Sequence, residues 1–395
     1  MAVELYSLPA AGLAFLLAWS AAWLLVRLGA TPLDAGRFAS IDGLRGFLAF
    51  AVFVHHSSIW FIYLRTGKWA APTSALFNQF GQGAVAIFFM ITAFLFTTKI
   101  LNAERGQLDW VRLYVGRITR LLPMYAVAVA VLWVMAWQLT GWMRKVPLTT
   151  LADEALGWAA FTIRGAPSVN GLTQARQLMA SVTWTLPYEW WFYLSLPLIA
   201  WLLGRERRFG WVGLAIVSVL LVRLGWLLDL LHLLPFAGGI IAAFTARSAR
   251  VRRFAEHWAA SVVVIVTIAV TATFLHSGFD PLAVGLYSIA FVLIAAGSSV
   301  FGLLTNTASR LLGETTYSVY LLHGLLLTLV LRFIIGLDVA ASWTTTQHWL
   351  LTLALVFPLV GLSYLGFRWI EAPGQRLAPR LLAVIRPERN QNALA

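Results

Sequence analysis

Two side chains eleven residues apart, Arg45 and His56, are the first candidates for chemistry in this chain. A helix rises 1.5 Å per residue, so His56 would lie about 16 Å beyond Arg45 and, after three turns, on the same face. Histidine is the usual general base near neutral pH. The spacing therefore predicts a base in line with a guanidinium, although a buried histidine bonded to a backbone carbonyl would give the same pattern. The neighbouring His55 points about 100° away and cannot share the role.

A second pair of basic residues, Arg117 and Arg120, stands at positions i and i+3 of an expected helix. Two guanidinium groups on one helical face can hold phosphates through paired hydrogen bonds. The same pair at a membrane boundary could instead anchor the helix to lipid headgroups. Both interpretations remain open from the spacing.

A carboxylate, Glu189, lies in an apolar stretch and needs either a partner or a proton there. It could orient a histidine, bind a sugar hydroxyl, or pair with Arg223 or Arg332. Ionisable groups inside membrane spans cost about 2.5–3.5 kcal/mol each on insertion scales, so each one is a functional hypothesis.

Two further sites carry polar groups in apolar surroundings. His323 follows Tyr317 and Tyr320 closely, and all three could bind a ligand or stabilise a helix end. For Glu371, near the end of the last apolar stretch, a structural contact is the favoured interpretation. The chain has no cysteine, which excludes thiol catalysis, cysteine-ligated metals and disulfides. No metal site is expected.

The elements that must position these residues are membrane helices. Of the 395 residues, 60% are hydrophobic and only 11% are charged, whereas soluble domains carry about 25% charged residues. One water-soluble core cannot bury so much apolar surface, so we expect a polytopic all-α bundle. Eleven apolar stretches approach the length that crosses a bilayer: 8–28, 44–64, 80–100, 121–142, 184–203, 210–233, 234–247, 257–275, 280–301, 316–336 and 348–369. The seventh, 234–247, is short and the least certain to span.

The basic residues predict an orientation. With alternate loops assigned to the cytoplasm, 21 of the 29 lysines and arginines lie inside, 6 lie outside and 2 lie within segments. This asymmetry places the N-terminus outside and the C-terminus inside. It also accounts for the net charge of +13 without a nucleic-acid partner. The longest outer loop, 143–183, includes a partly apolar stretch at 151–163 that could lie on the membrane surface.

These motifs together resemble the acyltransferase 3 family of integral-membrane O-acyltransferases, and they occur in that family's order. Ile41-Asp42-Gly43-Leu44-Arg45-Gly46 with His56 is similar to its opening arginine–histidine motif. The later motifs are Phe88-Phe89-Met-Ile-Thr92-Ala93-Phe94, Arg117-Ile-Thr-Arg120-Leu-Leu-Pro123-Met-Tyr125, Trp184 to Tyr193 around Glu189, Tyr317-Ser318-Val-Tyr320-Leu-Leu-His323 and Glu371-Ala-Pro373. Thr92, Ala93 and Pro187 depart from the family pattern.

The resemblance implies three regions. Residues 41–373 would form the acyltransferase domain with ten spans. Residues 1–40 would add an eleventh helix and a cytoplasmic linker, and residues 374–395 would form a basic cytoplasmic tail. The implied location is the inner membrane of a bacterium.

The resemblance also implies an activity. The protein would move an acyl group, acetyl being the expected one, from cytosolic acyl-CoA to a hydroxyl of a glycan or other surface or natural-product acceptor. His56 would act as general base, with Arg45 and Glu189 in the catalytic group. The donor would be held by a second group of residues: Arg117, Arg120, Tyr317 and His323. Acyl-CoA, the hydroxyl acceptor and the surrounding lipid would be its partners.

A transporter or proton-coupled flippase is the alternative function, because midplane histidine and glutamate residues also suit proton relays. The absence of an internal repeat and of paired glycine-broken spans counts against it. The acceptor, the acyl chain and the side from which the acceptor enters are left open. So are the oligomeric state, the role of helix 8–28, and whether His56 acts as a base in direct transfer or carries the acyl group transiently.

Overall fold

The computed structural model describes residues 4–32, 38–205 and 228–386, together with residues 215, 218, 219, 222 and 223. Within these ranges the chain is built from helices, and its only bridge of strand type is an isolated one between Val169 and Leu172. This confirms the expected all-helical architecture. The expected segment 210–233 falls largely outside the described residues.

The helices follow the apolar stretches closely. Those from the first half of the chain are α1 (Leu8–Arg27), α2 (Ala39–Thr66), α3 (Ala75–Asn102), α4 (Trp110–Leu139), α5 (Leu148–Ala159), the short turns η1 (Ala175–Met179) and η2 (Val182–Trp184), and α6 (Thr185–Leu202). Those from the second half are η3 (Leu230–Leu233), α8 (Leu234–Thr245), α9 (Ala249–Ala255), α10 (Trp258–Phe274), α11 (Pro281–Ala296), α12 (Thr307–Glu314), α13 (Thr316–Thr328), η4 (Leu329–Ile334), α14 (Leu337–Ser342), α15 (Thr345–Ala354), α16 (Val356–Gly366), η5 (Phe367–Glu371), α17 (Ala372–Gln375) and α18 (Ala378–Ile385).

Six of these helical stretches are long and apolar enough to cross a membrane, among the residues described. A seventh candidate, Leu230–Thr245 with Ala249–Ala255, is bent by 103° at its break. α10 and α11 are shorter apolar helices. The chain is therefore a multi-pass membrane protein, while the count of eleven spans stays a prediction.

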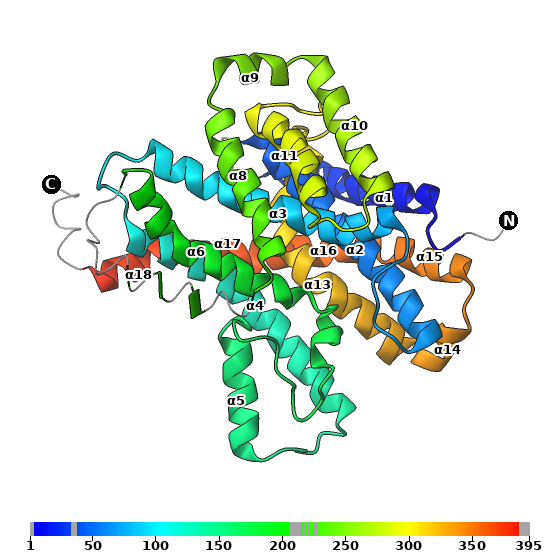
Figure 1. The fold of residues 1–395 in the computed structure, drawn as a ribbon. Coiled ribbons are helices and arrows are strands. Elements are labelled where there is room, and N and C mark those ends of the chain that lie inside the picture. Colours follow the sequence, from blue (N-terminus) through cyan, green and yellow to red (C-terminus); the bar gives the residue numbers. More distant parts are fainter. Residues whose placement is uncertain are drawn as a thin grey trace.

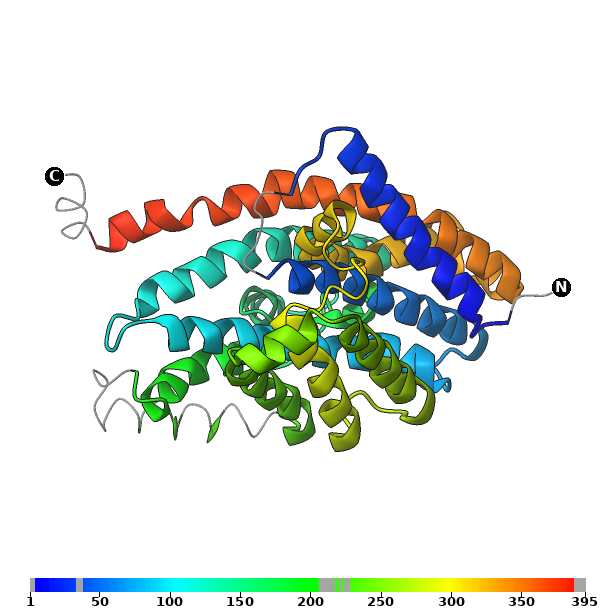
Figure 2. The same ribbon diagram turned by 90° about the horizontal axis from the view of Figure 1, so that it is seen from above.

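The long helices run in roughly the same direction through the bundle (Figure 2). α1 begins at one end of this bundle and α18 ends at the other (Figure 2). α8 to α11 gather on one side, and α4 with α5 lies on the opposite side (Figure 1). Which end faces the cytoplasm stays a prediction from the charge asymmetry.

The start of α2 is held by close backbone packing. A Cβ on Gly43 would lie 1.9 Å from the Leu304 carbonyl oxygen, and one on Gly313 of α12 would lie 1.7 Å from that of Asp42. Only glycine permits such approaches. Gly43 and Gly313 therefore allow the first turns of α2, which carry Arg45, to pack closely against Leu304 and α12.

The partly apolar stretch at 151–163 is largely helix α5. One side of this helix packs against the rest of the protein. Trp158 is fully buried, and its carbonyl accepts a 2.6 Å hydrogen bond from the Tyr125 hydroxyl of α4. Glu154 is also buried and accepts from the Asn170 backbone N–H at 2.7 Å. The loop 143–183 is thus anchored to α4 and has its own polar core.

Candidate active site

A cavity of about 300 Å³ opens between α2, α3, α4, α6 and α13. It gathers Arg45, Arg117, Arg120, Glu189 and Tyr317, which come from four helices. A volume of this size is at the lower end for ligand pockets in proteins. The tertiary structure therefore joins five of the seven candidate site residues in one cavity.

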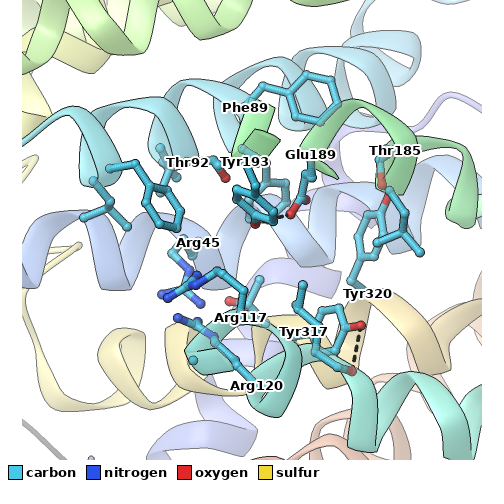
Figure 3. A pocket seen from close by; sticks show the side chains of 18 of the residues that line it. Arg45, Phe89, Thr92, Arg117, Arg120, Thr185, Glu189, Tyr193, Tyr317 and Tyr320 are labelled. Atoms are coloured by element: carbon cyan, nitrogen blue, oxygen red, sulfur yellow. Dashed lines mark hydrogen bonds between the residues drawn. The ribbon is translucent and has the colours of Figure 1, made fainter. Parts of the chain in front are cut away.

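The cavity has a cationic end and a hydroxyl-bearing end. The guanidinium groups of Arg45, Arg117 and Arg120 gather at one end, while Tyr320 and Thr185 lie at the other (Figure 3). Lys99 and Arg112 also line the cavity. Five cations thus face one lining carboxylate, Glu189, an excess that suits a ligand carrying several negative charges.

Each arginine is held in a specific way. Arg45 pairs with Asp42 at 3.6 Å, one turn earlier in α2, and its side chain is 15% exposed. The Arg117 guanidinium lies 4.9 Å from the centre of the Phe96 ring, a cation–π contact. These contacts limit the freedom of the two side chains, so less entropy is lost when an anion binds.

Glu189 is bound by a tyrosine and does not contact a histidine. The Tyr193 hydroxyl donates to the Glu189 carboxylate at 2.7 Å, one turn apart in α6. Arg117 also interacts with both Glu189 and Tyr193. Arg332 lies elsewhere, in a second cavity, and the exposed Arg223 has no ion pair with Glu189 among the described contacts. The carboxylate therefore belongs to the wall of the cationic cavity.

Tyr317 and Tyr320 are fixed by backbone carbonyls. Tyr317 donates to the carbonyl of Leu121 at 3.2 Å (Figure 3), and Tyr320 donates to that of Val182 at 3.1 Å. Tyr320 is also 3.1 Å from the Thr185 hydroxyl. These bonds connect α13 to α4 and α6, which closes the cavity at its hydroxyl-bearing end.

His56 and His323 lie outside the lining of this cavity and contact each other. His323 Nε2 is 3.1 Å from His56 Nδ1, and the ring centres are 5.0 Å apart. The Tyr320 ring, on the cavity wall, is 6.2 Å from that of His323. The histidine pair therefore lies close to the cavity wall at Tyr320.

The hydrogen bonds of the pair assign its protons. His56 Nδ1 is 3.0 Å from the Val52 carbonyl oxygen, and His323 Nδ1 is 3.0 Å from that of Val319. A carbonyl can only accept, so each Nδ1 carries the hydrogen and each Nε2 is bare. His56 Nδ1–H is then shared with His323 Nε2. In this arrangement no described hydrogen bond involves His56 Nε2, whereas His323 Nε2 faces His56 Nδ1.

His55 and Glu371 have structural contacts. His55 is buried, and its Nδ1 is 2.7 Å from the Phe77 carbonyl oxygen at the start of α3. Glu371 is also buried and accepts a hydrogen bond from Ser318 of α13. His55 therefore joins α2 to α3, and Glu371 joins the last long helix to α13.

Sequence reasoning had given no role to several lining residues, among them Lys99, Arg112 and Tyr193. Tyr193 stands four residues after Glu189, the spacing of neighbours on a helix face, and this signal could have identified it. In the sequence, Lys99 and Arg112 contributed only to the unequal distribution of basic residues between the two sides of the membrane. Nothing in their spacing indicates that α3 and α4 bring them together.

No group of three or more histidine, aspartate or glutamate side chains with metal-binding geometry occurs in the described part of the chain. Arg45 and His56 both lie on α2 as the spacing requires, but only Arg45 reaches the cavity lining. His323 was expected to bind the donor, and the structure places it against His56. The roles of these residues remain predictions.

Comparisons with known proteins agree with this architecture. One curated relative is nodulation protein 10 of Rhizobium leguminosarum bv. viciae, 26% identical over 194 residues. That match covers 47% of this chain and 50% of the relative, so it spans only half of the relative's length. No solved structure matches the chain significantly. The family model described as an acyltransferase domain, that of the acyltransferase 3 family, matches residues 38–368. This match covers most of the chain, including α2, α13 and the cationic cavity, and the protein belongs to the acyltransferase 3 family.

Proposed function

We propose that this membrane acyltransferase moves an acetyl group from cytosolic acetyl-CoA to a hydroxyl of a glycan or similar acceptor. The observation that carries the proposal is the cationic cavity, in which five basic side chains surround a space of about 300 Å³. CoA combines several phosphate charges with a narrow thioester arm. Its phosphates would meet Arg45, Arg117 and Arg120, which can form paired, charge-assisted hydrogen bonds.

The thioester would then point toward the hydroxyl-bearing end of the cavity. Tyr320 lies there, with the histidine pair behind it. Glu189 and its donor Tyr193 would fix Arg117 so that the phosphates enter in one orientation. The separation of a cationic end from a polar, uncharged end supports this direction of binding.

The chemical step uses His56 as general base. His56 Nε2 takes the proton of the acceptor hydroxyl while that oxygen attacks the thioester carbonyl. The bond from acyl carbon to acceptor oxygen forms, the carbon–sulfur bond breaks, and the proton passes to the CoA thiolate. His323 would stabilise the protonated His56 through the Nδ1–H···Nε2 contact of 3.1 Å.

The test is release of free CoA by the purified protein in detergent. Because the chain has no cysteine, a thiol reagent reports CoA without background from the protein. We expect release from acetyl-CoA that depends on His56 and increases when glycan acceptors are added. A flippase or transporter should release no CoA. Absence of release from acetyl-, propionyl- and longer acyl-CoA would refute the proposal.

The acceptor is identified in a second experiment. Mass spectrometry of cell-surface glycans and small metabolites, with and without the gene, gives the acyl mass and the acceptor together. An added mass of one acetyl group on a sugar is the expected result, and an unchanged profile would contradict the glycan acceptor.

A further inference from the structure

A second, smaller cavity of about 60 Å³ lies at the other end of the same helices. Its lining combines the aromatic rings of Trp60, Tyr63 and Trp69 with Gln174, Gln177 and Arg332. A single water needs about 10–15 Å³ of such space, so this cavity has room for several waters or one face of a small ring. Its polar lining consists of amide, hydroxyl, indole and guanidinium groups, without a carboxylate among the described residues.

Three helices place the histidine pair between the two cavities. Along α2, Arg45 lines the first cavity and Trp60 lines the second, with His56 in between. Along α13 and η4, Tyr317 lines the first cavity and Arg332 the second, and His323 again lies between them. α4 contributes its early residues to the first cavity and its last residue, Leu139, to the second.

Trp60, in the lining of this second cavity, lies on the same helix as the proposed base. It follows His56 by four residues, about 6 Å along α2 and on the same face. Trp60 is 2% exposed, and its indole N–H has no hydrogen-bond partner among the described residues. A buried donor without a partner costs about 1–3 kcal/mol, so this N–H points to a ligand that would accept its hydrogen bond.

The aromatic rings are fixed by one another. The ring centres of Trp60 and Trp69 lie 5.5 Å apart with their planes at 86°, and those of Trp60 and Tyr63 lie 5.6 Å apart at 89°. Such edge-to-face contacts hold flat apolar surfaces in place. An interfacial aromatic belt would leave these rings toward lipid, whereas Trp60 is buried inside the protein.

The connection between α5 and α6 supplies part of the lining of this cavity. Gly324, beside His323, lets η1 lie against α13, because a Cβ there would be 2.4 Å from the Met179 carbonyl carbon. The Thr328 hydroxyl donates to the Leu178 carbonyl at 2.9 Å and fixes the same contact. Gln177, in η1, is therefore held at the cavity, and neither its side-chain amide nor the Arg332 guanidinium has a described partner.

We propose that this second cavity is the acceptor subsite and that it binds a sugar ring entering from the face opposite the cationic cavity. The inference rests on the proposed function, and it adds the acceptor's binding site and its side of entry. The apolar face of a sugar would stack on the aromatic rings. Its hydroxyls would accept from the Trp60 N–H and from the Arg332 guanidinium, leaving one hydroxyl directed at His56. Donor and acceptor would then reach the histidine pair from opposite sides.

The test uses single cysteines in this naturally cysteine-free chain. Gln177→Cys, in proteoliposomes, is labelled with a membrane-impermeant maleimide applied to one side at a time. Thr173→Cys, on the same loop but outside the cavity lining, is the matched control, and Lys99→Cys reports the face of the cationic cavity. Methyl β-D-glucopyranoside, methyl β-D-galactopyranoside and N-acetylglucosamine are the probes, with linear sorbitol as the ring-free comparison.

We expect the Gln177→Cys variant to react from the side opposite to the Lys99→Cys variant, and at least one of the three sugars to slow its labelling. Labelling of the Thr173→Cys control should not change, and sorbitol should protect less. Reaction of the Gln177→Cys and Lys99→Cys variants from the same side would overturn the side of entry. Equal labelling of the Gln177→Cys variant with and without all three sugars would overturn the sugar site. Neither result depends on acyl transfer, so failure here is distinct from failure of the proposed function.

The Trp60 hydrogen bond is tested in the same Gln177→Cys background. Trp60→Phe should raise the half-protecting sugar concentration about 3- to 10-fold, the effect of one lost hydrogen bond. Trp158→Phe is the control, because its indole N–H is also buried without a described partner but lies outside the cavity. If Trp60→Phe does not fold, Arg332→Gln serves the same purpose. Equal protection in the variant and the control would refute the subsite.

Discussion

Replacement of His56 separates a catalytic histidine from a structural one, because its neighbour His55 is a matched control. In His56→Ala the base is lost. A general base contributes about 10²- to 10⁴-fold to rate, which is about 2.7–5.5 kcal/mol of activation free energy. We therefore expect CoA release to fall at least about 100-fold while acetyl-CoA still binds, since His56 does not line the cationic cavity.

Replacement of His55 should lower the folding stability rather than the rate. Its Nδ1 is 2.7 Å from the Phe77 carbonyl oxygen, and its ring fills the space next to Gly81. His55→Ala would remove this hydrogen bond, at about 0.5–1.5 kcal/mol of folding stability, and would leave a cavity beside Gly81 that lowers the stability further. We expect lower thermal stability but a rate within about threefold of the unchanged protein, measured well below its unfolding temperature, because no transition-state contact is lost.

Replacement of His323 should lower the rate by an amount between those expected for His56→Ala and His55→Ala. Because His323 would stabilise the protonated His56, His323→Ala loses a hydrogen bond to a charged group of about 1.5–3 kcal/mol, which corresponds to a decrease in rate of about 10- to 150-fold. The rate should also rise with pH as one imidazole becomes neutral, because protonated His56 cannot accept the acceptor's proton. The assay is CoA release at matched expression and folding. An inactive His55→Ala beside an active His56→Ala would refute the catalytic assignment.

Three other predictions concern the donor, the topology and the packing of the loop. Arg117→Ala should raise the KM for acetyl-CoA about 10- to 150-fold, since a charged hydrogen bond contributes about 1.5–3 kcal/mol, and lysine should rescue only in part. Replacement of the exposed Arg105, which lies outside the cavity, is the control. An unchanged KM in a folded Arg117→Ala/Arg120→Ala variant would assign these two arginines to lipid anchoring. A cysteine at position 109 should react only from the cytoplasmic side, and labelling from the periplasm would reverse the orientation. Gly324→Val should displace η1 and lower the unfolding temperature, whereas Gly285→Ala, with nothing within 4 Å, should not; equal unfolding temperatures would contradict the close contact.

Much of the architecture followed from local chemistry. Apolar stretches of about 20 residues must form helices in a bilayer, because every backbone polar group has to be satisfied within the segment. The positions of α1 to α4 were therefore largely predictable. The exceptions are the starts of α2, α3 and α4, each of which begins 5 to 11 residues before its apolar stretch. The cationic pair on α4 and the carboxylate on α6, each singled out in the sequence, line the same cavity, and their roles stay predictions.

Contacts between helices depend on packing that no local pattern encodes. The pairing of His56 with His323 joins residues 267 positions apart, and it exists because α2 and α13 lie side by side. Lys99 of α3 and Arg112 of α4 line one cavity because both helices border it. The sequence by itself determined the membrane helices, the candidate residues and the family motifs, since these depend on composition and on spacing along one helix. Only the tertiary structure decided which candidates share a cavity, which histidine contacts another, and where a second cavity lies, because those depend on distances between helices far apart in the chain.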